Sequence, residues 1–153
     1  MVGKKLKVYV GCALTSAPDD FIERIIALKI QLRNVLRVEI LDFFGGKGKA
    51  GPGVTPEQVW ARDIYECVAL ADAMLAICDL PSIGLGIEIE KAAGTRGIPT
   101  MIVAHHDVRI SHLVLGIPYP CVQVQRYQTL DEVVVMLQEF LSWAGLRRKP
   151  VLV

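Results

Sequence analysis

Short apolar segments alternate with longer segments of helical periodicity along the chain, and this alternation constrains the fold most. The segments expected to be strands are 5–11, 38–42, 73–78, 100–104 and 121–125. Between and after them, apolar residues recur at helical spacing over 19–33, 55–71, 85–95, 110–115 and 130–144. Strands that alternate with helices form parallel sheets covered on both faces. The sequence therefore predicts an α/β fold with three layers, flavodoxin- or Rossmann-like, whose five-stranded parallel sheet has the order 2-1-3-4-5.

The size and composition of the chain indicate one domain over residues 1–153 that associates with copies of itself. The sequence is 52% hydrophobic, and its mean hydropathy is +0.40. Nevertheless, no run approaches the ~20 apolar residues of a membrane span. Because large apolar patches seldom stay exposed, the excess predicts a homodimer or a higher homo-oligomer. The net charge of +1 gives no electrostatic footprint for nucleic acid.

Two features of the sequence predict a cytoplasmic protein. Lys4, Lys5 and Lys7 lead into a short strand, without the apolar core and cleavage site of a signal peptide. The four cysteines show neither paired nor zinc-type spacing, which favours reduced thiols.

The segment 74–88 predicts where a ligand binds. It starts as a buried strand, stops at Pro81, turns through Ser82, Gly84 and Gly86, and restarts as a helix that carries Glu88. In the predicted strand order, the crevice lies between the carboxyl ends of the first and third strands, where loops 11–16 and 79–86 meet. Unpaired N–H groups at such a helix start can bind an anion.

Two carboxylates lie on helix faces that otherwise point to the core. Asp63 falls within an apolar arc that is formed by Val59, Trp60, Cys67, Leu70 and Ala71. Glu88 lies at the border of the inward face of its helix, near Ala92. Each carboxylate also has a purely structural explanation. Asp63 could cap a nearby loop from a buried position. Glu88 lies in the first turns of its helix, where the helix dipole stabilises a negative charge by about 0.3–1 kcal/mol. Two carboxylates facing one crevice are, however, the minimal equipment for breaking a glycosidic bond.

Tyr9, Asp63 and the Gly84-x-Gly86-x-Glu88 motif resemble, in order and spacing, the nucleoside 2-deoxyribosyltransferase superfamily. That superfamily includes the 2'-deoxynucleoside 5'-monophosphate N-hydrolases, and the resemblance covers residues 6–125. It implies that Glu88 is the nucleophile of a covalent deoxyribosyl intermediate and that Tyr9 positions it. Asp63 would bind the sugar and transfer a proton to the base. The expected reaction is hydrolysis or base exchange at the N-glycosidic bond, without a metal or an organic cofactor.

Ser82 distinguishes two branches of that superfamily. Transferases that act on free nucleosides usually have aspartate there, whereas the monophosphate hydrolases have serine. A carboxylate would repel a 5'-phosphate, while a hydroxyl beside backbone N–H groups can bind one, so 5'-monophosphate substrates are favoured.

In the monophosphate hydrolases, the loop after the first strand offers a Gly-Ser pair to the phosphate. The corresponding loop here, residues 11–16, lacks that pair, so Thr15 or Ser16 would have to replace the serine. Arg109 and Ser111 resemble, one residue out of register, a segment that reaches the phosphate of the neighbouring subunit. Trp60 or the 45–53 loop is expected to close over the base. The expected substrate-binding residues are thus Ser82, Gly84, Gly86, Gly11, Cys12, Thr15, Ser16, Trp60, Arg109 and Ser111.

Three alternatives remain open from the sequence. The first is a nucleotide-binding domain without turnover. The second is a flavin redox or signalling module, which Cys12-Ala13-Leu14 disfavours because flavin domains have hydroxyl- and glycine-rich first loops. The third is a metal site formed by His105, His106 and Asp107 with His112, although surface or pocket-edge histidines are the default interpretation.

Overall fold

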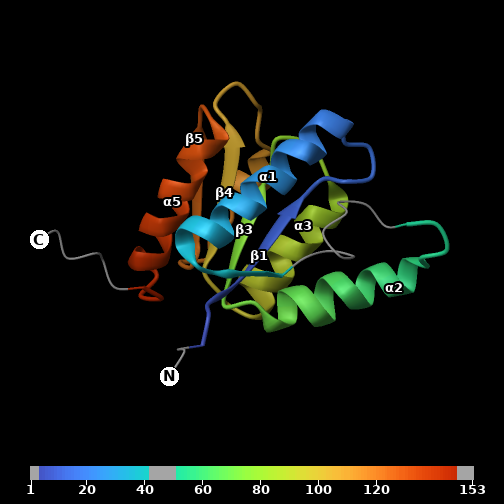
Figure 1. Cartoon of the computed structure of the whole chain (residues 1–153), viewed down its shortest axis with the longest axis horizontal. Helices are drawn as coiled ribbons and strands as arrows, with labels where there is room; N and C mark the ends of the chain where they lie inside the picture. The colour runs from blue at the N-terminus through green and yellow to red at the C-terminus, as the bar shows by residue number, and fades with distance from the viewer. Residues whose placement is uncertain (1–3, 42–50, 148–153) are drawn as a thin grey trace, which may run out of the picture.

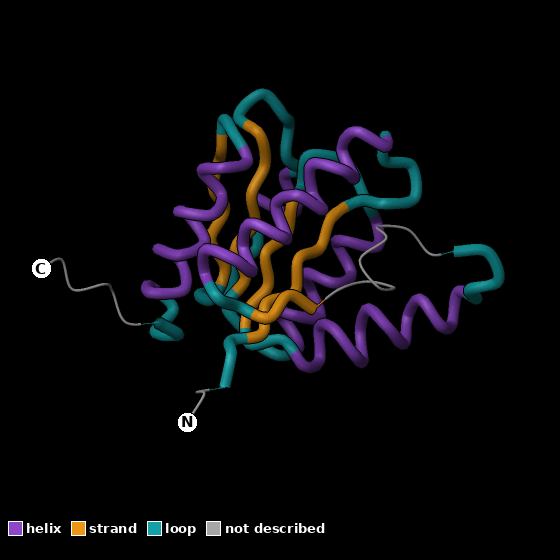
Figure 2. The backbone as a smooth tube through the Cα atoms, viewed as in Figure 1, coloured by secondary structure: helices purple, strands orange, loops and turns teal. Residues whose placement is uncertain are grey.

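Five parallel strands form one sheet in the predicted order. The computed structural model describes residues 4–41 and 51–147. The strands are β1 (Lys7–Cys12), β2 (Glu39–Leu41), β3 (Ala73–Ile77), β4 (Thr100–His105) and β5 (Val122–Tyr127). They pair in parallel in the order β2-β1-β3-β4-β5 (Figures 1 and 2). The predicted α/β fold is therefore confirmed.

Helices cover both faces of this sheet. On one face lie α1 (Asp19–Leu36) and α5 (Leu130–Trp143), which contribute to the same core cluster (Figure 1). On the other face lie α3 (Ile83–Ile89) with its continuation η4 (Glu90–Thr95), and the helix that begins as α2 (Pro56–Trp60). The short helix α4 (His112–Leu115) precedes β5. No helix in the described part of the chain is long and apolar enough to cross a membrane.

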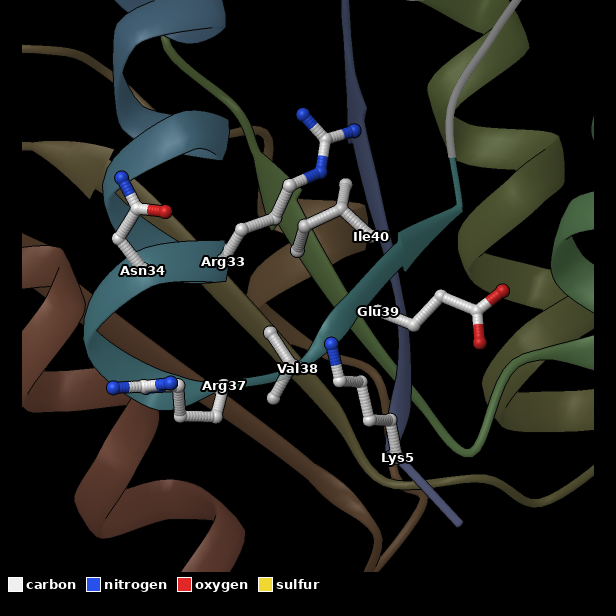
Figure 3. A pocket seen from close by; sticks show the side chains of 7 residues that line it. All are labelled: Lys5, Arg33, Asn34, Arg37, Val38, Glu39 and Ile40. Atoms are coloured by element: carbon white, nitrogen blue, oxygen red, sulfur yellow. The ribbon is translucent and has the colours of Figure 1, made fainter. Parts of the chain in front are cut away.

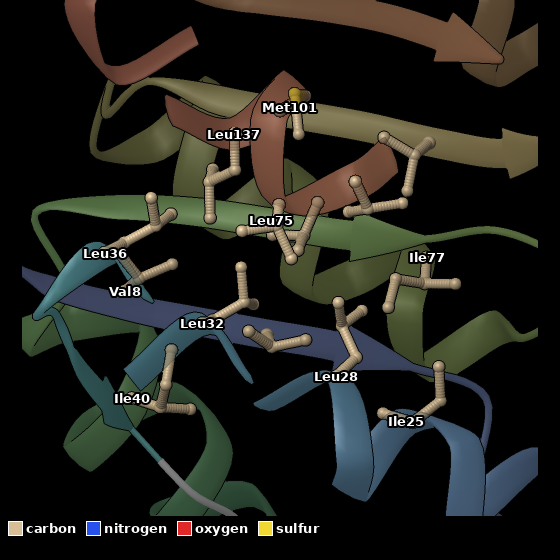
Figure 4. Close-up of a cluster of buried hydrophobic side chains, with 14 of the residues drawn as sticks. Val8, Ile25, Leu28, Leu32, Leu36, Ile40, Leu75, Ile77, Met101 and Leu137 are labelled. Atoms are coloured by element: carbon tan, nitrogen blue, oxygen red, sulfur yellow. The ribbon is translucent and has the colours of Figure 1, made fainter. Parts of the chain in front are cut away.

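The two core layers explain the apolar character of β3. Leu75 packs with Leu32 and Leu137 on the α1–α5 side (Figure 4). Met74 and Ala76 face the opposite cluster. All five residues of β3 are fully buried, as expected of a central parallel strand covered on both faces. Each large side chain buried in this way contributes roughly 1.5–3 kcal/mol.

The helix after residue 55 starts where the sequence predicts, but its periodicity changes along its length. The Thr55 hydroxyl accepts a hydrogen bond from the Gln58 backbone N–H (3.2 Å), and the Gln58 side chain accepts one from the Thr55 N–H (2.9 Å). After α2 the chain continues as the π-helix η2 (Ala61–Cys67) and the 3₁₀-helix η3 (Val68–Leu70).

This change of helix type corrects the predicted inward arc. Because a π-helix has more residues per turn than an α-helix, residues before and after η2 are rotated relative to a regular helix. Trp60 and Leu70 are therefore 40% and 54% exposed rather than buried, while Asp63 and Cys67 do face inward.

The strand register brings the two predicted loops together. Cys12 at the end of β1 lies opposite Ile77 at the end of β3. The chain segments that follow these residues consequently leave the same edge of the sheet, side by side.

Candidate active site

A small cavity beside α3 contains both carboxylates singled out by the sequence. Its volume is about 150 Å³, and Asp63 and Glu88 both line it. The remaining lining residues come from α2, η2 and α3 and are Pro56, Val59, Trp60, Ile64, Gly84 and Ile87. A cavity of about 150 Å³ accommodates a single small ring such as benzene. The space beside the two carboxyl groups therefore has the size of one sugar ring.

Asp63 is directed into this cavity by the π-helix η2. Its side chain is only 7% exposed, and its Oδ1 atom is buried without a hydrogen-bond partner. Burial raises the pKa of Asp63 to about 7, against the lowering effect of the positive charges of Arg62 and Lys29. This carboxyl group can thus hold a proton near neutral pH and exchange it.

Glu88 reaches the same cavity from α3. The neighbouring inward positions Leu85, Ile89 and Ala92 pack in the core, which holds the Glu88 side chain at 9% exposure. Its Oε2 atom is also buried without a hydrogen-bond partner. Burial, and secondly the nearby Asp63 carboxyl, raise the pKa of Glu88 to about 8, while the hydrogen bond from Tyr9 and the charge of Lys29 act in the opposite direction.

Tyr9 lies on β1 beneath Glu88 and is 2% exposed. Burial, and then the charges of Glu88 and Asp63, raise the pKa of its hydroxyl well above the ordinary value. The hydroxyl therefore stays protonated and donates its hydrogen bond to the Glu88 carboxylate. A fixed donor of this kind orients the carboxylate and favours its ionised form.

Gly11 leaves room for the Glu88 carboxylate. A Cβ atom on Gly11 would lie 2.8 Å from Glu88 Oε2 and 2.9 Å from Leu85 Cδ1, which is closer than real Cβ contacts. The sequence predicts Gly11 as a substrate-binding residue. In the structure Gly11 lies against Glu88. The absence of a side chain on Gly11 leaves the space that the Glu88 carboxylate occupies.

A second cavity lies on the other side of α3 and adjoins the first at Ile87, which lines both. Its volume is about 650 Å³, and the structure brings four predicted binding residues together in it, namely Ser82, Gly86, Arg109 and Ser111. The Ser82 hydroxyl caps α3 by accepting a hydrogen bond from the Leu85 N–H (3.1 Å). The Ser111 hydroxyl caps α4 by accepting a hydrogen bond from the Leu113 N–H (3.2 Å). Each hydroxyl keeps its own proton to donate to a ligand.

Three predicted binding residues of the first loop line neither of these cavities. Thr15 and Ser16 are exposed in the turn between β1 and α1. Cys12 packs against the core cluster on the α1 side, and burial raises the pKa of its thiol to about 11. Strand alternation explains the difference, because Gly11 faces the carboxylates and its neighbour Cys12 faces the opposite side of the sheet. Of the loop expected to close over the base, residues 45–50 lie outside the described residues, while Trp60 lines the small cavity.

Two other features of the surface lie apart from the carboxylates. A cavity of about 770 Å³ at the amino edge of the sheet is lined by Lys5, Arg33, Asn34, Arg37, Val38, Glu39 and Ile40. There the guanidinium groups of Arg33 and Arg37 point in different directions, so no common anion site is formed (Figure 3). The potential ligand atoms of His105, His106 and Asp107 lie within 4.8 Å of one another after β4. The His105 Nδ1 atom, however, already accepts a hydrogen bond from the Asp107 N–H (3.3 Å).

Sequence reasoning missed Lys29, the third charged side chain that is buried in the described part of the chain. A signal for it was present, because Lys29 follows Ile22 and Ile25 and precedes Leu32 and Leu36 at helical spacing. A lysine on such an apolar stripe is expected to be buried and to need a negative partner.

Comparisons with known proteins relate part of the chain to proteins named as nucleotide N-hydrolases. No family model matches the chain. The chain is 33% identical over 85 residues to a protein of Methanosarcina mazei that is provisionally named 2'-deoxynucleoside 5'-phosphate N-hydrolase 1, covering 54% of this chain and 52% of that protein. A protein of Methanosarcina barkeri with the same provisional name is 31% identical over 88 residues, covering 58% and 54%. The chain thus spans about half the length of the curated relatives it matches.

A solved structure extends the comparison of the fold. The Clostridium botulinum CMP N-glycosidase BcmB superposes with a TM-score of 0.65, over 88% of this chain and 99% of that chain. At 19% sequence identity this match shows a shared fold. The relatives confirm the predicted resemblance to the nucleoside 2-deoxyribosyltransferase superfamily over the part of the chain that they match.

Proposed function

We propose that this protein is an enzyme that cleaves the N-glycosidic bond of nucleotides through a covalent intermediate on Glu88. The observation that carries the proposal is the cavity of about 150 Å³ lined by Asp63 and Glu88. Each of these carboxyl groups is buried and keeps one oxygen without a partner. Burying a carboxyl oxygen without a hydrogen-bond partner costs free energy, and such groups are retained where they serve a function. An unsatisfied pair beside a cavity of sugar size therefore favours glycosidic chemistry.

The relatives support the same class of reaction. Two proteins that match about half of this chain carry the name of an N-hydrolase of 2'-deoxynucleoside 5'-phosphates, and a protein of the same fold is a CMP N-glycosidase. Deoxynucleoside and nucleoside 5'-monophosphates are therefore the first substrates to test.

In the first step, the Glu88 carboxylate attacks C1' of the sugar while the bond from C1' to the base nitrogen breaks. The electron pair of that bond leaves with the base, and Asp63 supplies the proton that neutralises it. General acid catalysis of this kind contributes roughly 10²–10⁴-fold. The products of the step are the free base and an ester between the sugar and Glu88.

In the second step, water attacks C1' and the ester bond breaks, which returns Glu88 as a carboxylate. Asp63, now ionised, takes the proton from the water. A second base that occupies the place of the water would give base exchange instead. This retaining route requires two carboxyl groups about 5 Å apart.

The mechanism assigns one proton to the pair of carboxyl groups. Without substrate, the pKa values of about 7 for Asp63 and about 8 for Glu88 mean that the pair shares at least one proton at neutral pH. The reaction needs that proton on Asp63. In the free enzyme burial leaves Glu88 with the higher pKa, so the proton has to pass from Glu88 to Asp63 before attack, and the hydrogen bond from Tyr9 acts in that direction.

The adjoining cavity of about 650 Å³ is proposed to hold the 5'-phosphate. Ser82 and Ser111 offer hydroxyl donors, and Arg109 offers a positive charge. Arginine suits this role because its guanidinium group can bind two phosphate oxygens at once.

We also propose that a second copy of the chain covers this face. Ile83 and Leu113 line the same cavity and are 88% and 85% exposed, which is unusual for large apolar side chains. Sedimentation equilibrium with wild-type protein and with Ile83→Lys tests this proposal. A dimer that the substitution weakens is expected, whereas a wild-type monomer at all concentrations would contradict it.

A base-release assay tests the proposed activity. Purified protein is incubated with the four deoxynucleoside 5'-monophosphates, the four ribonucleoside 5'-monophosphates and the corresponding nucleosides, and the free base is quantified by chromatography. We expect base release from monophosphates, with a loss of at least 10³-fold in Glu88→Gln. The matched control is Glu139→Gln, an exposed glutamate of α5 that lines neither cavity, which should retain activity. Tight nucleotide binding without base release would instead indicate a binding domain.

A further inference from the structure

We propose that Asp79 is a positioning residue that holds together the two loops of the proposed phosphate cavity. Asp79 lies just after β3, three residues before Ser82, and its carboxylate binds the end of β4, from which the loop with Arg109 and Ser111 leaves. The inference rests on the proposed function, because it gives Asp79 a task only if the cavity of about 650 Å³ holds a phosphate. Asp79 touches no substrate in this proposal and acts through the two loops.

Both carboxylate oxygens of Asp79 accept hydrogen bonds from neighbouring strands. Oδ1 accepts one from the backbone N–H of His105 at the end of β4 (2.9 Å). Oδ2 accepts one from the hydroxyl of Tyr127 at the end of β5. Tyr127 is buried, and burial, followed by this hydrogen bond, raises the pKa of its hydroxyl, which therefore stays protonated as a donor. Asp79 thus links the ends of three neighbouring strands.

The contact with His105 takes the place of a backbone hydrogen bond of the sheet. Just before it, the Cys78 N–H donates to the Val103 carbonyl (2.8 Å), as in a regular parallel pair. If that pairing continued, the His105 N–H would donate to a backbone carbonyl of the chain after β3. It donates to the Asp79 side chain instead. The carboxylate therefore joins the two chain segments at the point where they leave the sheet and become loops.

The two chain neighbours of Asp79 line the proposed phosphate cavity, but Asp79 itself does not. Cys78 and Leu80 belong to the lining of that cavity of about 650 Å³. Asp79 instead lines a separate cavity of about 630 Å³ on the α1–α5 side of the sheet. Asp79 therefore supports one wall of the phosphate cavity from behind, which is the place of a positioning residue and not of a ligand-binding one.

The loop after β4 is also fixed to β5. The guanidinium group of Arg126 donates hydrogen bonds to the carbonyl oxygens of His105 (3.3 Å) and Val108. The loop that leads to Arg109 is therefore attached to β5 at two points. Asp79 joins this assembly to the loop before α3 through its own two hydrogen bonds.

Removal of the Asp79 carboxylate has a defined consequence for binding. Without it, the loop with Ser82 can move relative to the loop with Arg109. A phosphate between them then loses hydrogen bonds, since these depend steeply on distance and angle. Asp63 and Glu88 lie on helical segments that pack in the core, so the reacting groups should keep their places. The expected defect is therefore one of monophosphate binding and not of the chemical step.

The experiment measures kcat and KM for base release from a nucleoside 5'-monophosphate in the wild-type protein, Asp79→Ala and Asp79→Asn. In Asp79→Ala we expect KM to rise about tenfold with kcat little changed, because a misplacement of about 1 Å in a site can cost up to ~10²-fold. Asp79→Asn keeps an oxygen that accepts the His105 N–H and should keep a KM close to that of the wild type. The matched control is Asp131→Ala, which removes an exposed carboxylate that lines the same cavity of about 630 Å³ and should change neither constant.

Two outcomes would overturn the proposal. One is a loss of kcat in Asp79→Ala with an unchanged KM, which is the signature of a purely structural role. The other is wild-type kinetics of Asp79→Ala. Should Asp79→Ala not fold, Tyr127→Phe takes its place, because it removes only the hydrogen bond to Oδ2. A raised KM with an unchanged kcat in Tyr127→Phe supports the proposal, and an unchanged KM overturns it.

Titration calorimetry separates failure of this proposal from failure of the proposed function. If the wild-type protein releases no base, the Kd of the same monophosphate is measured for the wild type, Asp79→Ala and Asp79→Asn. Weaker binding by Asp79→Ala that Asp79→Asn restores supports the positioning role and leaves only the proposed reaction refuted. Equal affinities, or no binding by the wild type, overturn the positioning role. Base release by Asp79→Ala with a wild-type KM would, conversely, refute the positioning role and leave the proposed reaction standing.

Discussion

The burial of Glu88 predicts that the protein loses stability as the pH rises from about 5 to 8. In the unfolded chain the carboxyl group has an ordinary pKa of 4.5, whereas burial raises its pKa in the folded protein to about 8. Between these values the folded state binds a proton that the unfolded state does not bind. Stability from this proton is fully present below pH 4.5 and is lost as the pH rises through 8.

The size of the effect follows from the pKa difference. One carboxyl group that is protonated only in the folded state changes the free energy of unfolding by about 1.4 kcal/mol per pH unit. From pH 5 to pH 8 the contribution of Glu88 amounts to about 4 kcal/mol, a large part of the 5–15 kcal/mol typical of a domain. Glu88→Gln replaces the carboxyl group by an amide of similar shape that stays neutral throughout this range.

Urea denaturation of the wild-type protein and Glu88→Gln at half-unit steps from pH 5 to 8 measures this effect. The free energies of unfolding should diverge in favour of Glu88→Gln by about 1.4 kcal/mol per pH unit. Any constant cost of the amide shifts one curve without changing its slope, so the slope is the readout. Glu90→Gln, which changes an exposed side chain of the same helical segment, should run parallel to the wild type. Parallel curves for Glu88→Gln as well would refute the claim that burial raises the pKa of Glu88 in the folded protein.

Three further predictions concern the neighbours of the two carboxyl groups. Gly11→Ala places a methyl group against Glu88 Oε2 and should lower kcat/KM at least tenfold, and an unchanged rate would show that Glu88 has room to shift. Tyr9→Phe removes the hydrogen bond that favours ionised Glu88, so the acid limb of the kcat/KM profile should move to higher pH, and a stationary limb would disprove that role. Ser82→Asp should raise KM for monophosphates at least tenfold and leave nucleosides little affected, and equal changes for both would place the phosphate elsewhere.

Most of the fold could be predicted from periodicity, because strand and helix segments differ in the spacing of their apolar residues. The strand order also followed, since alternating strands and helices leave few arrangements of a parallel sheet. The ends of the elements were less certain. For example, β5 runs from Val122 to Tyr127, whereas 121–125 was expected.

The direction of individual side chains depended on local helix type. Asp63 and Glu88 were recognised because a carboxylate on an apolar stripe is conspicuous in any helix. The exposure of Trp60 and Leu70 could not be predicted, because nothing in the sequence distinguishes the π-helix η2 from a regular helix.

The sequence identified the acidic residues of the candidate site more completely than its binding residues. Ser82 and Glu88 belong to one motif, yet they line different cavities because they lie on different sides of α3. Thr15 and Ser16 were assigned to the site as replacements for the serine that the hydrolases have in this loop, but the loop turns toward solvent before α1. Lys29 shows that apolar stripes should be searched for cations as carefully as for acids.

The covalent intermediate tests the central claim most directly. Protein mixed rapidly with a cleavable deoxynucleoside 5'-monophosphate and quenched in acid is analysed by intact-mass spectrometry, followed by peptide mapping. We expect an adduct with the mass of the deoxyribose phosphate on the peptide that contains Glu88, formed with release of the base and absent in Glu88→Gln. Base release by Glu88→Gln at the wild-type rate, or an adduct on a different residue, would contradict the assignment of Glu88 as the nucleophile.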